Sequence, residues 1–453
     1  MTPVLADNPE ISRKSAKSER WFAAHAMLPT GLAHDVLIEV ADGRFASITP
    51  GSDPAGVPRL PGVALPGFAN AHSHAFHRAL RGRTHDRGGT FWTWRDAMYA
   101  VAARLDPDSY LRLARATYAE MALAGVTTVG EFHYLHHAPD GTRYDDPNAM
   151  AAALTEAAAD AGIRLTLLDA CYLAGGLVAD GHLPLDPVQE RFSDGTVYAW
   201  ADRVAALRDN ERVRVGHAIH SVRAVPSKDL APAVDPARPL HIHVSEQPAE
   251  NEACEAFYGC SPTELLTDAG ALGPMTTAVH ATHLTAFDVA LLGASRSTVC
   301  FCPSTERDLA DGIGPARELV DAGAGLSLGS DQNARVDLLG EASALEEDER
   351  LRTLHRGRFT AAELLLALTA HDSLGWPDTG ALVVGGRADL VCVRDDTLRT
   401  AGSDRSQLVL AASAADVATV WVDGRVIVEE GRHRLGDVGR MLSEAINPLW
   451  EHD

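Results

Sequence analysis

The sequence predicts an α/β protein: a distorted (β/α)8 barrel of the TIM type, with a small β-sandwich domain built from both termini. Eight short apolar runs in the middle of the chain are each followed by a stretch rich in Ala, Leu, Glu and Arg. Alternating strands and helices give a parallel sheet, and eight such units over roughly 260 residues suit a barrel of about 250 residues. Both ends of the chain instead have the pattern of β-hairpins.

The predicted barrel strands are short, and several of them end in polar residues. Two of the helical segments between them stop at Gly125 and Gly162, the residue type that commonly ends a helix. An open, doubly wound sheet is the alternative, but it would normally carry a glycine-rich nucleotide-binding motif, which this sequence lacks. We expect the strands within residues 63–74, 127–134, 163–173, 213–223, 239–247, 277–284, 297–306 and 324–333.

The two ends of the chain contain matching turn signals. Asp42-Gly43 and Asp423-Gly424 each separate two strand-like runs, as expected of hairpin turns. The polar residues at the N-terminus, 1 to about 19, lack any periodicity, which is typical of a mobile terminus. The expected organisation is an arm at 1–19, β-sandwich strands at 20–65, the barrel at 66–379, and the rest of the β-sandwich with a tail at 380–453.

The composition excludes several kinds of partner. Acidic residues outnumber basic ones 62 to 40, giving a net charge of −22, which argues against nucleic-acid and anionic-membrane surfaces. No run is long and apolar enough to cross a bilayer, and the N-terminus lacks the apolar core of a signal peptide. The six cysteines are scattered, which is typical of free thiols in a reducing compartment. We expect a cytoplasmic protein, with a homodimer as the working assumption.

Histidines gather where predicted strands end, which is where barrel enzymes keep their active sites. His72 and His74 are two residues apart in a strand, so their side chains point to the same side. The fifth strand carries His241 and His243, either of which could add a third imidazole, and strand alternation does not decide between them. A single pair of this kind is more often structural than metal-binding.

Carboxylates at other strand ends favour a metal site over purely structural histidines. Asp331 follows the eighth strand, and three imidazoles with one carboxylate form a nitrogen and oxygen set suited to zinc. Glu246 follows the fifth strand and could carry protons for a water that the metal activates. His280 ends the sixth strand. Taken together, these residues predict a metal-dependent hydrolase rather than a set of unrelated polar side chains.

These motifs resemble those of the amidohydrolase superfamily, in its deaminase branch with one metal ion. The matching segments are LPGFANAHSH, HIHVSEQ, VHATHL and LGSD, and GALVVGGRADLVCV is similar to the strand that returns into the small β-sandwich. The resemblance covers nearly the whole chain. It implies that Glu246 is the proton shuttle and that His280 polarises the surroundings of the attacked carbon, and it implies four metal ligands: His72, His74, His243 and Asp331.

The resemblance also bears on the number of ions. Members with two metals bridge them through a carbamylated lysine at the fourth strand, where this chain reads GHAIHSVR without a lysine. The chain has three lysines, Lys14, Lys17 and Lys228, and none lies at a predicted strand end. One divalent ion is therefore expected, zinc in the first place, with Fe2+ as the alternative for the same ligands.

Narrower motifs resemble the formimidoylglutamate deiminase family: HSHAFHRALRGR, FWTWRDAMY, GEFHYLHH, HSVRAV and HIHVSEQ. That resemblance implies hydrolysis of N-formimino-L-glutamate to N-formyl-L-glutamate and ammonia, a step of histidine degradation. His77 occupies a position where some members have glutamine. The residues implied to hold the substrate are His77, Arg95, Tyr134, His220 and Arg223.

The chemistry of that substrate supports the same residue types independently. It carries two carboxylates, which arginine binds in a bidentate manner, and Arg95 and Arg223 lie nearest to predicted strand-end loops. Either could instead be a surface arginine, and Tyr134 a buried core phenol. The loop sequence after Asp331, Gln332-Asn333-Ala334-Arg335, differs from that of some members of the family. Two groups stay open: His133, His136 and His137, expected to support a loop, and Gln332, Asn333 and Arg335, which form either a carboxylate clamp or a plain loop.

The expected mechanism uses few residues. Glu246 and Asp331 accept the proton of the activated water, which attacks the formimino carbon, while His280 stabilises the tetrahedral centre electrostatically. Glu246 then passes the proton to the leaving nitrogen, and ammonia departs. One alternative is a deaminase of the same branch acting on guanine, a related heterocycle or another formimino or guanidino acid. The other is a catalytically silent barrel scaffold, against which the complete ligand set argues.

Overall fold

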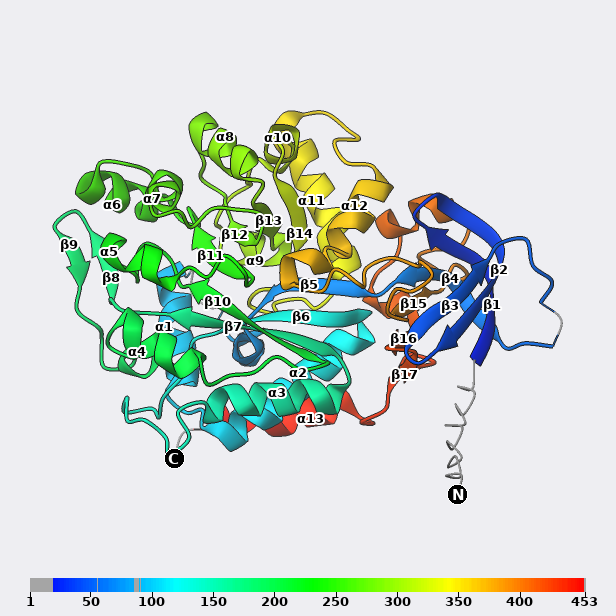
Figure 1. Cartoon of the computed structure of the whole chain (residues 1–453), viewed down its shortest axis with the longest axis horizontal. Helices are drawn as coiled ribbons and strands as arrows, with labels where there is room; N and C mark the ends of the chain where they lie inside the picture. The colour runs from blue at the N-terminus through cyan, green and yellow to red at the C-terminus, as the bar shows by residue number, and fades with distance from the viewer. Residues whose placement is uncertain (1–18, 55, 85–88, 90, 452–453) are drawn as a thin grey trace, which may run out of the picture.

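The computed structural model describes residues 19–54, 56–84, 89 and 91–451, and it contains a parallel barrel beside a mixed sheet (Figure 1). The arm expected at 1–19 lies outside the described residues up to residue 18, while Glu19 is already the first residue of a strand. Among the helices of these ranges, none combines the length and the apolar composition needed to cross a membrane.

The barrel sheet has eight parallel strands in the order β14-β13-β12-β11-β10-β7-β6-β5. A bridge between Ser73, which ends β5, and Asp331, which lies just beyond β14, brings the first and last strands together and nearly closes the sheet. Each strand coincides with one of the eight expected runs, so the predicted fold class is confirmed. The strands are β5 (Phe68–Ser73), β6 (Val126–His133), β7 (Arg164–Cys171), β10 (Val213–Ile219), β11 (Leu240–Val244), β12 (Thr276–His280), β13 (Thr298–Phe301) and β14 (Gly325–Leu328).

Helices cover the outer face of the barrel, and local signals set their ends. Asp106 caps α2 by accepting a 2.7 Å hydrogen bond from the amide of Ser109, and Pro107 occupies the first helical position. Gly162 ends α3 with a φ of 89°, a left-handed conformation that glycine adopts without strain. The helices are α1 (Phe91–Ala102), α2 (Pro107–Leu123), α3 (Ala149–Ala161), α4 (Val197–Val204), α5 (Ser227–Leu230), α6 (Pro248–Tyr258), α7 (Pro262–Asp268), α8 (Ala286–Ser295), α9 (Pro303–Asp308), α10 (Ala316–Ala322), α11 (Leu338–Thr353), α12 (Ala361–Leu368) and α13 (Val438–Ile446).

The two ends of the chain form one mixed sheet, ordered β18-β17-β16-β15-β4-β1-β2-β3, in which β4 pairs antiparallel with β15 (Figure 1). Both predicted Asp-Gly turns are present, and all four of their residues have positive φ, as type I′ hairpin turns require. The strands are β1 (Glu19–Leu28), β2 (Gly31–Ala41), β3 (Arg44–Thr49), β4 (Arg59–Pro66), β15 (Leu390–Val393), β16 (Val417–Val422), β17 (Arg425–Glu429) and β18 (Arg432–His433).

A small hairpin of β8 (Gly176–Val178) and β9 (Gly181–Leu183) follows β7 and packs against α6. Nothing in the sequence predicted it, because three-residue strands are too short to show an alternating pattern. The hairpin matters for function because Leu177, Val178 and Leu183 line the cavity described below.

Trp376 is a buried contact point between the barrel and the terminal sheet. Its indole donates a 3.0 Å hydrogen bond to Thr166 Oγ1, and three guanidinium groups lie over its ring. Two of these come from the barrel strands β7 and β10, Arg164 at 5.4 Å and Arg214 at 4.1 Å from the ring centre, and the third, at 5.3 Å, belongs to Arg387, which precedes β15. Cation–π contacts of this kind add to the apolar burial of the ring.

We expect Trp376→Ala to lower the free energy of unfolding by about 3–5 kcal/mol, the usual cost of truncating a fully buried aromatic side chain. Urea unfolding followed by circular dichroism measures this loss. Tyr198→Ala serves as the control, because 71% of the Tyr198 surface is exposed and its removal should change stability by less than about 0.5 kcal/mol. A Trp376 variant as stable as this control would contradict the assigned role.

Candidate active site

Four side chains converge at the carboxyl end of the barrel strands. Nε2 of His72 in β5 lies 3.1 Å from Nε2 of His243 in β11. His72 and His74, which directly follows β5, both face Asp331. Oδ1 of Asp331 is 3.6 Å from His72 Nε2 and 3.4 Å from His74 Nε2. A tetrahedral zinc ion with bonds of about 2.1 Å separates its ligand atoms by about 3.4 Å. The three distances are close to that separation, and the three imidazoles lie near enough to one another to hold one ion.

Hydrogen bonds at the far side of two imidazoles aim their Nε2 atoms at that point. Nδ1 of His74 donates to the carbonyl of Phe132 at 2.9 Å, and Nδ1 of His243 donates to the carbonyl of His220 at 2.8 Å. With the proton fixed on Nδ1, each Nε2 presents a lone pair. Burial lowers the pKa of His74 to about 3 and that of His243 well below its usual range, which favours the neutral ring that a metal ligand requires.

The backbone around Asp331 keeps this carboxylate close to the first strand. The amide of Asp331 donates to the carbonyl of His72 at 2.9 Å, and its carbonyl accepts from the amide of His74 at 2.9 Å. A Cβ on Gly329 would come within 2.9 Å of both His72 Cβ and Cys302 Sγ, so only glycine permits this approach. Burial raises the pKa of Asp331 to about 7, and a cation at the site would favour its charged form.

His280 lies beside this cluster, among three carboxylates. Its Nδ1 is 3.4 Å from Glu306 Oε1, and its Nε2 is 3.7 Å from both Glu246 Oε1 and Asp331 Oδ2. Burial alone would lower the pKa of His280, but the Glu306 hydrogen bond and the charges of the three carboxylates raise it well above the usual value. The side chain is thus suited to carry a positive charge next to a developing negative one.

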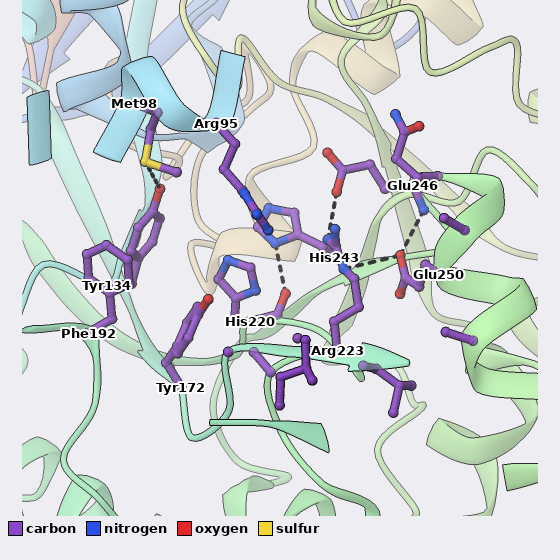
Figure 2. A pocket seen from close by; sticks show the side chains of 18 of the residues that line it. Arg95, Met98, Tyr134, Tyr172, Phe192, His220, Arg223, His243, Glu246 and Glu250 are labelled. Carbon is purple, nitrogen blue, oxygen red and sulfur yellow. Dashed lines mark hydrogen bonds and ion pairs between the residues drawn. The ribbon is translucent and has the colours of Figure 1, made fainter. Parts of the chain in front are cut away.

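A cavity of about 540 Å3 opens onto these groups, and all five residues expected to hold the substrate line it. Nε2 of His77 and the hydroxyl of Tyr134 share a 2.8 Å hydrogen bond. Arg95 descends from α1, whereas Arg223 comes from the loop after β10 and lies between Glu246 and Glu250 (Figure 2). The cavity therefore holds two guanidinium groups that come from different walls.

Aromatic residues complete the walls of this cavity, and the sequence analysis had not singled them out. Gln189 links two of them, because its amide nitrogen lies 2.8 Å from the hydroxyl of Tyr99 and 2.9 Å from that of Tyr172. The guanidinium carbon of Arg95 is 5.4 Å from the ring centre of Tyr99. Trp94 and Phe192 also line the cavity. The FWTWRDAMY segment, which holds Trp94 and Tyr99, could have indicated an aromatic wall in advance.

The loop after Asp331 does not reach the cavity in the described residues. Gln332 donates to Asp308 Oδ2 at 2.7 Å, and Asn333 donates to the carbonyl of His74 at 3.0 Å. Arg335 lines a separate cavity. These contacts favour a plain loop over a carboxylate clamp. Asn333 joins the segment after β14 to the segment that carries His74.

The second histidine cluster also has structural contacts. His136 Nε2 donates to the carbonyl of Ala170 at 2.9 Å, and His137 Nε2 is 3.2 Å from Asp194. His133 and His136 lie close enough to Asp169 to hold a metal ion. However, Arg203 already binds both oxygens of Asp169, at 2.7 and 2.8 Å, so a positive charge occupies this position.

Comparison with known proteins adds to this geometry. The sequence profile of the Amidohydrolase family matches residues 63–427, which is most of the chain. The chain belongs to the amidohydrolase family. A second profile, described as the N-terminal domain of the formimidoylglutamate deiminase HutF, matches residues 21–60 of this amidohydrolase.

Individual proteins with similar sequences or structures agree with this placement. The chain is 37% identical to a formimidoylglutamate deiminase of Pseudomonas aeruginosa, over 91% of this chain and 95% of the relative. It is 30% identical to a 5-methylthioadenosine/S-adenosylhomocysteine deaminase of Pelotomaculum thermopropionicum, over 92% and 94%. The structure of an amidohydrolase from Brucella melitensis superposes with a TM-score of 0.87 at 32% identity, covering 96% of this chain and all of that one. An adenosine deaminase from Xanthomonas campestris with bound zinc has the same fold, with a TM-score of 0.80 at 23% identity, covering 94% and 96%.

Two buried glutamates of this amidohydrolase were missed by sequence reasoning. Glu306 follows β13, the seventh barrel strand, and contacts His280. Glu250 lies in the first turn of α6 beside Arg223. The Glu306 segment ends in a polar residue after a strand, which was a usable signal. Glu250 had none, since an isolated acidic residue in a helix is usually solvated.

Proposed function

We propose that this amidohydrolase hydrolyses N-formimino-L-glutamate to N-formyl-L-glutamate and ammonia, as a step of histidine degradation. The observation that carries the proposal is the pair of guanidinium groups, Arg95 and Arg223, in one cavity with the convergent histidines. Two arginines suit a substrate with two carboxylates. The 37% identity to a formimidoylglutamate deiminase over nearly the whole chain supports the same substrate.

One divalent ion would be held by His72, His74, His243 and Asp331, zinc in the first place and ferrous iron as the alternative. When bound, such an ion supplies a water activated for attack at neutral pH. A single ion is supported by the position of Lys228, the lysine within the described residues, which lies on α5 rather than at a barrel strand end.

The protein's own groups move the protons. Water adds to the formimino carbon and displaces the imino nitrogen, so the C=N bond is replaced by C=O and ammonia leaves. Glu246 and Asp331 accept the two protons of the attacking water, one before the attack and one as C=O forms. Both protons pass to the leaving nitrogen through Glu246, so that it departs as NH3. His280, held by Glu306 at 3.4 Å, places a positive charge next to the tetrahedral centre. Tyr134, His77 and His220 would contact the rest of the substrate from the cavity wall.

The proposal is tested by ammonia release from a panel of purified compounds: N-formimino-L-glutamate, N-formimino-L-aspartate, a guanidino acid, guanine and adenosine. We expect the highest kcat/KM with N-formimino-L-glutamate. If kcat/KM for another compound is higher by about tenfold or more, that compound replaces N-formimino-L-glutamate as the proposed substrate. If none of them releases ammonia, the proposed function is rejected. The homodimer and the cytoplasmic location stay predictions, and light scattering on the purified protein tests the first.

A heterocycle deaminase is the second candidate, because aromatic side chains line part of the cavity. Trp94, Tyr99 and Tyr172 could stack against a flat ring. Two guanidinium groups in the same cavity favour an anionic substrate over such a neutral one, since arginine binds carboxylates through paired hydrogen bonds. Guanine and adenosine in the panel decide between the two candidates.

Removing one of the two guanidinium groups should lower the catalytic efficiency with the dicarboxylate substrate. We expect Arg95→Met to lower kcat/KM for N-formimino-L-glutamate roughly 10–150-fold, the equivalent of one hydrogen bond to a charged group. Arg208→Met is the control, because Arg208 is exposed and bonds to backbone carbonyls on the outside of the barrel. Equal kinetics for the two variants would remove Arg95 from the binding site.

A further inference from the structure

Arg223 lies between two glutamates, and one of them is the proposed proton carrier (Figure 2). Its Nη2 donates to Oε2 of Glu246 at 2.7 Å, while its Nε is 3.7 Å from Oε2 of Glu250. The other oxygen of Glu246, Oε1, is 3.7 Å from His280 Nε2. In the structure described here, the guanidinium group thus occupies one of the two oxygens through which Glu246 can exchange a proton.

Several contacts hold Arg223 and its loop in addition to the bond with Glu246. The backbone amide and Nε of Arg223 both donate to Ser221 Oγ at 3.3 Å, and its carbonyl accepts from Nδ1 of His182 at 3.2 Å. His182 belongs to β9 and is itself bonded to the hydroxyl of Tyr258 on α6 at 2.8 Å. The loop that carries Arg223 is therefore tied to the hairpin and to α6. If the bond between Arg223 and Glu246 breaks, we expect Glu246 to move.

Glu250 allows that bond to be exchanged at low cost. It is fully buried behind Arg223, and its Oε1 has no hydrogen-bond partner among the described residues. Its Oε2 accepts from the backbone amide of Glu246 at 3.2 Å, which keeps the start of α6 in place whatever the Glu246 side chain does. Arg223 therefore keeps one carboxylate partner after Glu246 leaves.

A substrate carboxylate can take the place of Glu246 on Arg223, because one charge-assisted bond then replaces another of the same kind. In N-formimino-L-glutamate the α-carboxylate is attached to the carbon that bears the retained nitrogen, the one that stays bound to the formimino carbon when ammonia leaves. That carboxylate is the one that lies beside Glu246 when the formimino carbon lies at the convergent histidines. The second carboxylate, two carbons further along the chain, is left for Arg95, which comes from α1.

We propose that Arg223 makes turnover depend on this α-carboxylate. The carboxylate takes over the hydrogen bond from Arg223, and Glu246 is thereby released to carry the proton. The inference rests on the proposed function and narrows its substrate class to amidines with a carboxylate on the carbon that bears the retained nitrogen. An amidine without that group meets a site whose proton carrier is still bound, so it loses kcat and not only affinity.

A pair of substrates tests the dependence. N-formimino-L-glutamate is compared with 4-formiminobutanoate, which keeps the distal carboxylate and lacks the α-carboxylate. We expect kcat of the second compound to be roughly 10–150-fold lower, as for the loss of one hydrogen bond to a charged group. An unchanged kcat with a raised KM would show that the carboxylate serves only binding and would overturn the proposal.

Removing the Arg223 guanidinium group should speed turnover of 4-formiminobutanoate and slow that of N-formimino-L-glutamate. Arg223→Met removes the guanidinium group, so kcat for 4-formiminobutanoate should rise at least about tenfold, while kcat/KM for N-formimino-L-glutamate falls about 100-fold. The double variant Arg223→Met, Glu250→Gln keeps the local charge balanced and should behave alike. Arg95→Met is the matched control and should lower kcat/KM for both substrates. A loss for both substrates in both Arg223 variants, with normal metal content and thermal unfolding, would overturn the proposal.

Two further measurements separate this proposal from the proposed function. In a crystal of the metal-loaded protein with N-formyl-L-glutamate, we expect Arg223 to bind the ligand's α-carboxylate and to have lost its contact with Glu246. A retained 2.7 Å bond with the ligand in place contradicts the exchange. If N-formimino-L-glutamate releases no ammonia, the proposed function fails, and the effect of Arg223→Met on hydrolysis of formamidine, expected to be a rise of at least about tenfold, still decides the role of Arg223.

Discussion

Glu246→Gln is expected to lower kcat by about 100- to 10,000-fold, the usual contribution of one general acid–base group, while the protein keeps one equivalent of metal. The amide has nearly the same shape as the carboxylate and can still accept a hydrogen bond from Arg223, which lies 2.7 Å away. It cannot take up a proton from the attacking water or deliver one to the leaving nitrogen. The position of the residue is kept and its proton chemistry is lost.

Steady-state ammonia release and metal analysis of the same sample measure both parts of this result. Glu252→Gln is the matched control, because Glu252 is exposed at the outer wall of the same cavity. It should retain activity within a factor of about two. Wild-type turnover in the Glu246 variant would exclude this residue as the proton carrier, whereas loss of metal would point to a structural role.

Loss of the ion should also have a large effect. Treatment with a chelator or the substitution His243→Ala is expected to lower activity on the order of 1,000-fold or more, since a bound metal contributes several kcal/mol to such reactions. Nε2 of His243 is 3.1 Å from that of His72, so its removal opens one side of the ligand set. Zinc added back should restore the chelated wild-type protein but not the variant.

His241→Ala provides the control, because His241 lies two residues earlier on the same strand. Its Nε2 donates to the carbonyl of Ser373 at 3.2 Å, away from the convergent point. We expect this variant to be less stable but to bind one equivalent of metal. A His241 variant without metal, or a fully active His243 variant, would contradict the ligand assignment.

Strand positions in the barrel were predictable because each strand is a run of buried apolar residues. All eight residues of β6 and of β7 are buried, as is typical of parallel strands covered on both faces. The pairing of β4 with β15 was predictable only as a general expectation that the ends fold together. Its register depends on contacts between distant segments, which no local pattern encodes.

Within the site, strand alternation predicted which side chains face inward but not how deep they lie. His241 and His243 point to the same side of β11, and they differ by two residues along the strand axis. That difference separates a carbonyl partner in Ser373 from the cluster around His72. The contact between Arg223 and Glu246 joins two loops 23 residues apart and depends on rotamers, so no spacing rule could predict it.

The shared terminal sheet has a consequence for synthesis of the chain on the ribosome. Leu390, the first residue of β15, follows Pro66, the last of β4, by 324 residues (390 − 66), which take about 16–65 s to make at 5–20 residues per second. During that interval β4, whose last four residues are buried in the finished sheet, has an unpaired and aggregation-prone edge. The nascent chain is therefore expected to need chaperone protection until β15 emerges, and a truncated chain that ends before residue 390 should be far less soluble than the complete protein.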